Sequence, residues 1–256
     1  MTFSIIGTGN IAWFFGSRLV TGRHHCTGVY GRNRQSALLL QEALMADNSG
    51  GIDDLKDGES DVCFLLVSDN AIIEIVSKIS LTQTVLIQTA GAVSLDLLKP
   101  SSTDYGVIWP IYSIVKTNPP THRNIPCGWE FSTDRAKRFG LEVAHAITDI
   151  LFEARYEQRK WLHLSAVISN NFTNHLLAIC EQICKDNDLQ FNVLMPIIEQ
   201  TFERIKTAPP GSLQTGPAIR KDTPTIQSQI NLLSGHPKWQ KIYEDISSSI
   251  QASTIK

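Results

Sequence analysis

The stretch that decides the fold is Phe3-Ser4-Ile5-Ile6-Gly7-Thr8-Gly9-Asn10-Ile11-Ala12. Its apolar part, residues 3–6, predicts a β-strand, and the apolar spacing over residues 11–20 predicts a helix directly after it. In such a strand–turn–helix, Gly7 permits the tight turn, Gly9 lets the backbone approach a pyrophosphate, and Ala12 is small enough for close helix–sheet packing. Free N–H groups at the helix start favour anions. The stretch therefore predicts a dinucleotide-binding turn built from Gly7, Thr8, Gly9, Asn10, Ile11 and Ala12; the alternative is an ordinary strand–helix turn of small residues.

The same alternation continues over the first 150 residues. Residues 62–67 are apolar at every position, which is typical of a strand covered on both faces by helices. Further strands are predicted at residues 27–30, 84–88, 105–108 and 150–154, and helices at residues 35–45, 71–79 and 134–146. This order predicts an α/β fold, a Rossmann-like doubly wound and mostly parallel sheet.

The second half of the chain changes to a helical pattern. Residues 158–186 contain no Gly or Pro, which predicts one long helix, and residues 192–206, 224–233 and 237–253 predict three more. We therefore expect two domains, a dinucleotide-binding domain over residues 1–154 and an all-helical domain over residues 155–256 that carries substrate contacts and dimerisation.

Composition narrows the class of protein. The chain has 256 residues with 42% hydrophobic and 19% charged residues, and its net charge of −2 argues against nucleic-acid binding. Five cysteines, an odd number without metal-ligand spacing, predict a reduced, cytoplasmic setting and no metal site. Neither a signal peptide nor a membrane-spanning segment is expected.

The residues after the second predicted strand indicate which dinucleotide is bound. An NAD site needs Asp or Glu there for the ribose hydroxyls, but the sequence reads Gly31-Arg32-Asn33-Arg34, and Glu42 is the first acidic residue of the chain. Arginines suit a 2′-phosphate. These four residues therefore predict NADP, unless both arginines are merely solvated.

Two further strand ends are expected beside the cofactor. Val67, Ser68 and Asp69 end one strand and Thr89, Ala90 and Gly91 end the next, and ligands bind at the carboxyl ends of strands in open α/β sheets. Small residues there leave room for a nicotinamide ribose. Asp69 is alternatively the N-cap of the following helix.

On the long predicted helix, five polar residues share one arc. At roughly 100° per residue, Lys160, His163, Asn171, Asn174 and His175 fall within about 120° of one another. Such an arc is either a solvated face or the wall of a substrate cleft, and the pattern leaves both interpretations open.

A polar loop in the helical half is the last candidate. Residues 214–222 combine the chain-breaking pair Gly216-Pro217 with Arg220 and Asp222. A planar guanidinium suits a carboxylate or phosphate, so Arg220 either clamps an acidic substrate or pairs with an internal carboxylate. Asp222 alternatively caps the next helix.

Four stretches carry a resemblance to a known family: residues 7–12, 106–113, 165–176 and 214–222. With them the chain resembles NADP oxidoreductases that join a Rossmann-like domain to a helical C-terminal domain of unknown function, and it is similar in arrangement to pyrroline-5-carboxylate reductase, ketopantoate reductase and the 3-hydroxyacid dehydrogenases. The resemblance implies hydride transfer between a nicotinamide and a small C=O or C=N substrate, and a homodimer through the helical domain. Trp109 stands where many relatives carry His.

These observations combine into one functional hypothesis and one alternative. The hypothesis is an NADP-dependent oxidoreductase whose candidate catalytic residues are His163, Asn171, Asn174, His175 and Arg220. The alternative is a non-catalytic NADP-binding sensor or scaffold module, which the Trp109 departure keeps open.

Overall fold

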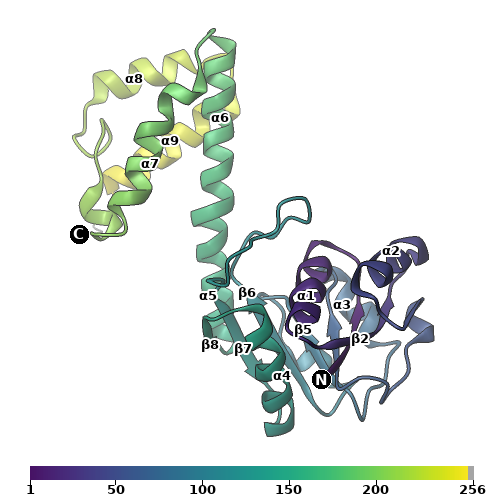
Figure 1. Ribbon diagram of the computed structural model, residues 1–256. Helices are drawn as coiled ribbons and strands as arrows, with labels where there is room; N and C mark the ends of the chain where they lie inside the picture. The colour runs from purple at the N-terminus through teal and green to yellow at the C-terminus, as the bar shows by residue number, and fades with distance from the viewer. Residues whose placement is uncertain (253–256) are drawn as a thin grey trace. The chain divides into compact units, whose positions relative to one another are not determined.

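The computed structural model describes residues 1–252, and its N-terminal part is built on one eight-stranded sheet (Figure 1). The strands lie in the order β3-β2-β1-β4-β5-β6-β7-β8. Pairing is parallel from β3 through β6, antiparallel between β6 and β7, and parallel again between β7 and β8. The strand bounds are β1 (Thr2–Ile6), β2 (His25–Tyr30), β3 (Asn48–Gly50), β4 (Val62–Leu65), β5 (Val85–Gln88), β6 (Tyr105–Pro110), β7 (Cys127–Phe131) and β8 (Leu151–Glu153). The predicted Rossmann-like, mostly parallel α/β fold is confirmed.

Helices cover both faces of this sheet because neighbouring apolar residues of the central strands point in opposite directions. Ile5 and Phe64 belong to one buried core cluster, whereas Ile6 and Leu65 belong to the other. The helices of this part are α1 (Asn10–Thr21), α2 (Arg34–Leu44), α3 (Asp69–Val76) and α4 (Asp134–Ile147), with 3-10 turns η1 (Ile52–Asp54) and η2 (Leu95–Leu98).

Two strands were missing from the sequence prediction. β3 has the sequence Asn-Ser-Gly and β7 the sequence Cys-Gly-Trp-Glu-Phe, and neither has the apolar run that predicts a strand. Both form because a neighbouring strand supplies their hydrogen-bond partners: β3 pairs with β2, and β7 lies between β6 and β8. β7 also runs antiparallel to β6, and β8 keeps the direction of β7.

The long predicted helix consists of three segments of different geometry. α5 (Tyr156–Ala166) is followed by a π-helical segment, η3 (Val167–Phe172), and then by α6 (Thr173–Asp186). A π segment bonds i→i+5 and so takes up more residues per turn than an α-helix. The uniform rotation assumed for the polar arc is therefore wrong beyond Ala166.

Short helices follow. They are η4 (Phe191–Leu194), α7 (Met195–Arg204), η5 (Pro210–Leu213), α8 (Thr223–Leu232) and α9 (Pro237–Ala252). Pro196 lies in the first turn of α7, where proline is tolerated. Ser253, the last residue of the predicted helix, lies outside the described residues.

The chain divides into two compact units, Met1–Ser169 and Asn170–Lys256. The strand–helix alternation ends near residue 154, but the first unit extends further because α5 is anchored to the sheet by Arg159, whose side chain is fully buried. The division into a cofactor domain, residues 1–154, and a substrate and dimerisation domain, residues 155–256, concerns function and remains a prediction. The two compact units describe only how densely the chain contacts itself.

Candidate functional site

The turn after β1 has the backbone that the glycine pattern predicts. Gly7 has a φ of 121°, and a Cβ placed on it would lie 2.1 Å from the carbonyl oxygen of Leu66. Its N–H donates to the carbonyl of Tyr30 at 2.8 Å, which ties the turn to the end of β2. Gly9 is the N-cap of α1, and a Cβ on it would meet no atom within 4 Å. Gly7 is thus required by the protein itself, whereas Gly9 leaves open space in front of the first turn of α1.

A cavity of about 470 Å³ opens at this turn. It lies at the carboxyl ends of β1, β2, β4 and β5, at the point where the strand order reverses between β1 and β4, the expected ligand position in this class of fold. Eleven predicted cofactor residues line it: Gly7, Thr8, Gly9, Asn10, Ile11, Gly31, Arg32, Asn33, Val67, Ser68 and Thr89. Ile52, Ala71, Ile75 and Ile114 also contribute, from segments that carry no recognisable motif.

Two of the predicted cofactor residues do not line the cavity and instead form part of the helices α1 and α3. Ala12 is fully buried in the core beneath α1, where its small side chain allows close packing. Asp69 is the first residue of α3, and Ser68 is the N-cap, so the alternative N-cap assignment of Asp69 is wrong by one residue.

The two arginines after β2 differ in their partners. Arg34 forms an ion pair with Asp54 of η1 at 3.3 Å, and the Asp54 carboxylate also accepts the Gly51 N–H at 2.7 Å. Arg32 lines the cavity, and no hydrogen bond or ion pair of its guanidinium occurs among residues 1–252. Asn33 caps α2 by accepting the Ser36 N–H at 3.0 Å. Arg32 is therefore the cation available to a ligand.

Asp54 is an acidic residue near this edge that the sequence argument missed. It lies 24 positions after Tyr30, whereas the sequence pattern of an NAD site places the acidic residue directly after the second strand. The pairing of β3 with β2 nevertheless brings its segment beside Gly31. Gly31 N–H donates to the Gly50 carbonyl at 3.0 Å. Only the formation of β3 reveals this neighbourhood, and β3 has no sequence signal.

The carboxyl ends of β5 and β6 are packed with side chains. Thr89 lines the cavity, while Ala90 packs against the second core cluster. Gly91 lies against the indole of Trp109, because a Cβ on Gly91 would be 2.3 Å from that ring. The expected space at Gly91 is therefore filled by Trp109.

His163 is the one predicted catalytic residue within the first unit. It lies half-buried on α5, and its ring centroid is 6.0 Å from that of Trp109 with a tilt of 42°. The structure thus brings the His163 imidazole beside Trp109 near the end of β6, the strand that pairs with β5. His163 is not among the residues that line the cavity.

One turn before His163, a buried arginine anchors α5. Arg159 donates to the Glu130 carboxylate, to the Ala154 carbonyl at 2.8 Å and to the Val93 carbonyl at 3.2 Å. Gln88, also fully buried, donates to the same Val93 carbonyl at 3.4 Å and accepts the Ala90 N–H at 2.9 Å. Arg159 therefore holds both His163 and the segment after β5, and its burial was not apparent from the sequence.

The other predicted catalytic residues lie in the second unit. Asn171, at the end of the π segment, and Asn174 and His175 in α6 are exposed. Arg220 is exposed too, and no hydrogen bond or ion pair of its guanidinium occurs in the part of the chain that the structure describes. Asp222 caps α8 by accepting the Thr225 N–H at 3.2 Å, which confirms the capping alternative. The substrate role of these residues remains a prediction.

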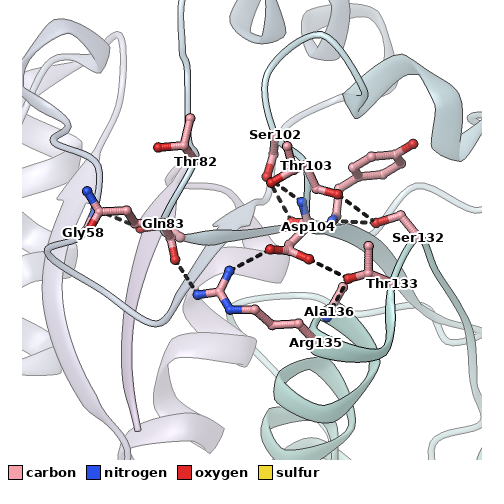
Figure 2. Close-up of polar contacts among 12 residues, drawn as sticks. Gly58, Thr82, Gln83, Ser102, Thr103, Asp104, Ser132, Thr133, Arg135 and Ala136 are labelled. Atoms are coloured by element: carbon pink, nitrogen blue, oxygen red, sulfur yellow. Dashed lines mark hydrogen bonds and ion pairs between the residues drawn. The ribbon is translucent and has the colours of Figure 1, made fainter.

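A polar network at the amino ends of the strands, away from the cavity, holds the fold together. Figure 2 shows Asp104, just before β6, between Thr133 and Arg135, with Arg135 also donating to the Gln83 carbonyl. Burial acts to raise the pKa of Asp104, but the hydrogen bonds from Thr133 and Arg135 outweigh it and hold the pKa below its ordinary value. The network fastens α4 to the amino ends of β5 and β6.

The cysteines and other potential metal ligands are dispersed. All five cysteines are free, and burial raises the pKa of Cys26, Cys63 and Cys127 to about 12. Among residues 1–252, no three His, Cys, Asp or Glu side chains gather as metal ligands would. In the same residues, no helix combines the length and apolar character needed to span a bilayer.

Comparison with known proteins agrees with this geometry. A solved structure from Bacteroides fragilis, described as a putative NADP oxidoreductase, is 28% identical, covers 98% of this chain and 98% of that chain, and has a TM-score of 0.90. A 1-pyrroline-5-carboxylate reductase from Streptococcus pyogenes is 12% identical over 99% of both chains with a TM-score of 0.64. A prephenate dehydrogenase from A. aeolicus, solved with hydroxyphenyl propionate and NAD+, is 13% identical over 63% of this chain and 62% of that chain, with a TM-score of 0.55. No curated protein sequence matches.

The second and third of these structures share only the fold, because their identity is low. The resemblance inferred from the sequence is confirmed in its arrangement, a Rossmann-like N-terminal domain followed by a helical region. Residues 125–250 match the model of a domain of unknown function, DUF2520.

Proposed function

We propose that the protein is an oxidoreductase that transfers a hydride between NADP and a small carbonyl or imine substrate. The observation that carries the proposal is the cavity at the reversal point of the strand order, lined by Gly9 and the first turn of α1. A Cβ at Gly9 would enter empty space, and no acidic residue occupies the first turn of α1. These residues fit a pyrophosphate, since the open backbone N–H groups and the helix dipole both favour an anion.

The preference for NADP over NAD rests on Arg32. Arg32 lines the cavity, its guanidinium forms no hydrogen bond or ion pair among the described residues, and arginine suits a 2′-phosphate. The Asp54 carboxylate, in the segment that pairs beside Gly31, already binds Arg34 and the Gly51 N–H. A carboxylate engaged in this way is a poorer acceptor for ribose hydroxyls, which supports the same choice.

When bound, the nicotinamide supplies or accepts the hydride. The chain must then hold the substrate and deliver a proton to the oxygen or nitrogen that becomes an alcohol or amine. His163 is the candidate for this proton because it lies on α5 beside the ring of Trp109, which stands near the end of β6. Asn171, Asn174, His175 and Arg220 are the proposed substrate contacts, with Arg220 suited to an acidic group.

We also propose a homodimer through the helical part of the chain. Within residues 170–252 the buried apolar side chains are only Ile179, Cys184 and Ala218. Eleven large apolar side chains of the same residues are exposed by 36% or more: Phe172, Leu176, Leu189, Val193, Met195, Ile197, Phe202, Ile205, Ile219, Leu232 and Ile246. So much exposed apolar surface indicates an interaction site, and a second copy is the proposed partner.

The test combines binding with turnover. Fluorescence titration of the purified protein should show binding of NADPH, and a panel of small ketones, imines and 2-oxoacids should contain a compound that oxidises it. Failure to bind either NADPH or NADH would contradict the proposal. Tight NADPH binding without turnover of any compound would favour a non-catalytic NADP-binding module.

A further inference from the structure

The connection between β6 and β7 runs along the cofactor cavity. Because β7 is antiparallel to β6, residues 111–126 leave and re-enter the sheet at the edge where β6 ends. This is also the edge where β1, β4 and β5 end and where the cavity opens. Ile114 of this connection is buried and lines the cavity.

Two residues further on, Lys116 lies beside the first turn of α1. Its backbone N–H donates to the Asn10 side-chain oxygen at 3.2 Å, and Asn10 is the first residue of α1. Its Nζ lies 3.8 Å from the centroid of the Trp13 ring, one turn along the same helix. Asn10 lines both the cofactor cavity and a second cavity of about 480 Å³, which Lys116 and Trp13 line. The Lys116 backbone therefore lies beside Asn10, which borders the cofactor cavity, while its ammonium lies over Trp13, which lines the second cavity.

The connection is anchored by its backbone on the C-terminal side of Lys116, while the Lys116 side chain is exposed. The Arg18 guanidinium donates to the Pro120 carbonyl at 2.8 Å and the His122 carbonyl at 2.7 Å. Arg123 binds Asp149 at 2.8 Å and so fastens the far end of the connection. The exposed ammonium, by contrast, contacts only an aromatic face, a weaker attraction than a charge-assisted hydrogen bond to a phosphate oxygen.

The charge around this position also favours an anion. The first turn of α1 has no acidic residue, and Lys116 forms no ion pair with any carboxylate of residues 1–252. The N-terminus of α1 adds partial positive charge. Arg32, which does line the cavity, follows β2, on the side of β1 away from β6.

We propose that Lys116 binds the pyrophosphate of the dinucleotide, leaving the Trp13 ring when the cofactor enters. The inference rests on the proposed function, since it assigns a further residue to the same cofactor site. The pyrophosphate is common to NADPH and NADH, whereas the 2′-phosphate proposed for Arg32 is present only in NADPH. Lys116 therefore contributes equally to both cofactors, and Arg32 to one.

The test measures the Kd of NADPH and NADH for Lys116→Met, Lys116→Arg and Arg32→Ala in the full chain. We expect Lys116→Met to weaken both cofactors by the same factor, about tenfold or more, as expected for loss of one charge-assisted contact. Lys116→Arg should retain most of the affinity, because it keeps the charge. Arg32→Ala should weaken NADPH alone.

Lys137→Met is the matched control. Lys137 is also an exposed lysine whose Nζ lies over an indole, 4.8 Å from the centroid of Trp129, but it lines no part of the cofactor cavity. The Lys137→Met variant should bind both cofactors as the unmodified protein does. Both Met variants should keep the Tm of the unmodified protein. If Lys116→Met binds both cofactors normally, or loses affinity for NADPH alone, the inference is wrong while the proposed function stands. If the unmodified protein binds neither cofactor, the proposed function itself fails.

Discussion

Arg159 on α5, whose side chain is fully buried, forms an ion pair with Glu130 on β7, whose side chain is 23% exposed. Removing one partner of a buried pair leaves an uncompensated charge, which costs about 3–5 kcal/mol. We therefore expect Glu130→Gln to lower the free energy of unfolding by about 3 kcal/mol, measured by urea denaturation. Arg159→Met should cost less, because the remaining carboxylate is partly hydrated. Glu153→Gln is the control: Glu153 pairs with Arg155 at 3.8 Å with both side chains exposed, and it should change stability by less than about 1 kcal/mol. Equal stability of Glu130→Gln and Glu153→Gln would contradict the role of the buried pair.

The same substitution at the two glycines of the first turn should affect two different properties, stability at Gly7 and cofactor binding at Gly9. Gly7→Ala should destabilise the fold by more than about 2 kcal/mol, because its Cβ would collide with the Leu66 carbonyl and its φ of 121° is strained for alanine. Gly9→Ala should leave the Tm unchanged and weaken NADPH binding about tenfold or more, because its Cβ would occupy the open space in front of α1. Thermal unfolding and cofactor titration measure the two effects. A Gly9→Ala variant with normal affinity would mean that the cofactor does not approach this backbone.

Arg32 and Arg34 should differ although they are two positions apart. Arg32→Ala should lose about 1.5–3 kcal/mol of NADPH binding and none of NADH binding, since only NADPH carries the 2′-phosphate. Arg34→Ala should lose less, because Arg34 is already paired with Asp54. Titration of both cofactors against both variants checks this. Equal affinity of the unmodified protein for the two cofactors, unchanged in Arg32→Ala, would exclude the NADP preference.

The carboxylate of Asp57 predicts a pH dependence of stability at acid pH. Burial acts to raise its pKa, but hydrogen bonds from the Thr82 hydroxyl and from the N–H groups of Thr82, Gln83 and Thr84 outweigh burial and lower the pKa from 3.8 to about 2. A carboxyl group whose pKa is lower in the folded state stabilises the fold at pH values above its ordinary pKa. This stabilisation is lost as the pH falls from about 4 to about 2. Because the group is partly hydrated, we expect a contribution on the order of 1–2 kcal/mol. Urea denaturation of Asp57→Asn should show this loss at pH 6 and almost none at pH 2; a loss that is independent of pH would contradict the assignment.

The exposed apolar side chains of residues 170–252 predict self-association. Light scattering at micromolar concentration should give a mass of twice 28.5 kDa, and the Tm should rise with protein concentration, as it does when folding and association are linked. A single 28.5 kDa species with a constant Tm would exclude the homodimer.

The sequence predicted those parts of the fold that depend on local pattern. The buried run of β4 and the strained turn at Gly7 each follow from a few consecutive residues, so most strands and the cofactor turn were found. β3 and β7 were missed because their pairing partners, distant in sequence, stabilise them.

The site was predictable to the same degree. Eleven of the expected cofactor residues line one cavity because they follow strands that end at one edge. The burial of Arg159 and the pairing of Arg34 with Asp54 depend on tertiary contacts that no spacing rule contains. The predicted arc of polar residues assumes a uniform α-helix, and this assumption fails from Val167 on. The sequence shows helical periodicity but does not reveal a π segment.

The reversal of strand direction at β7 has a consequence for how this protein can change. A crossover between parallel strands must traverse the sheet and pack against a face, so its length is constrained by the core. Residues 111–126 need not traverse the sheet, because both of their ends lie at one edge. They are held instead by buried Ile114 and by the contacts of Arg18 with the Pro120 and His122 carbonyls. Changes of length between these anchors should leave every strand register intact, so specificity can evolve there, or be engineered, without rebuilding the sheet.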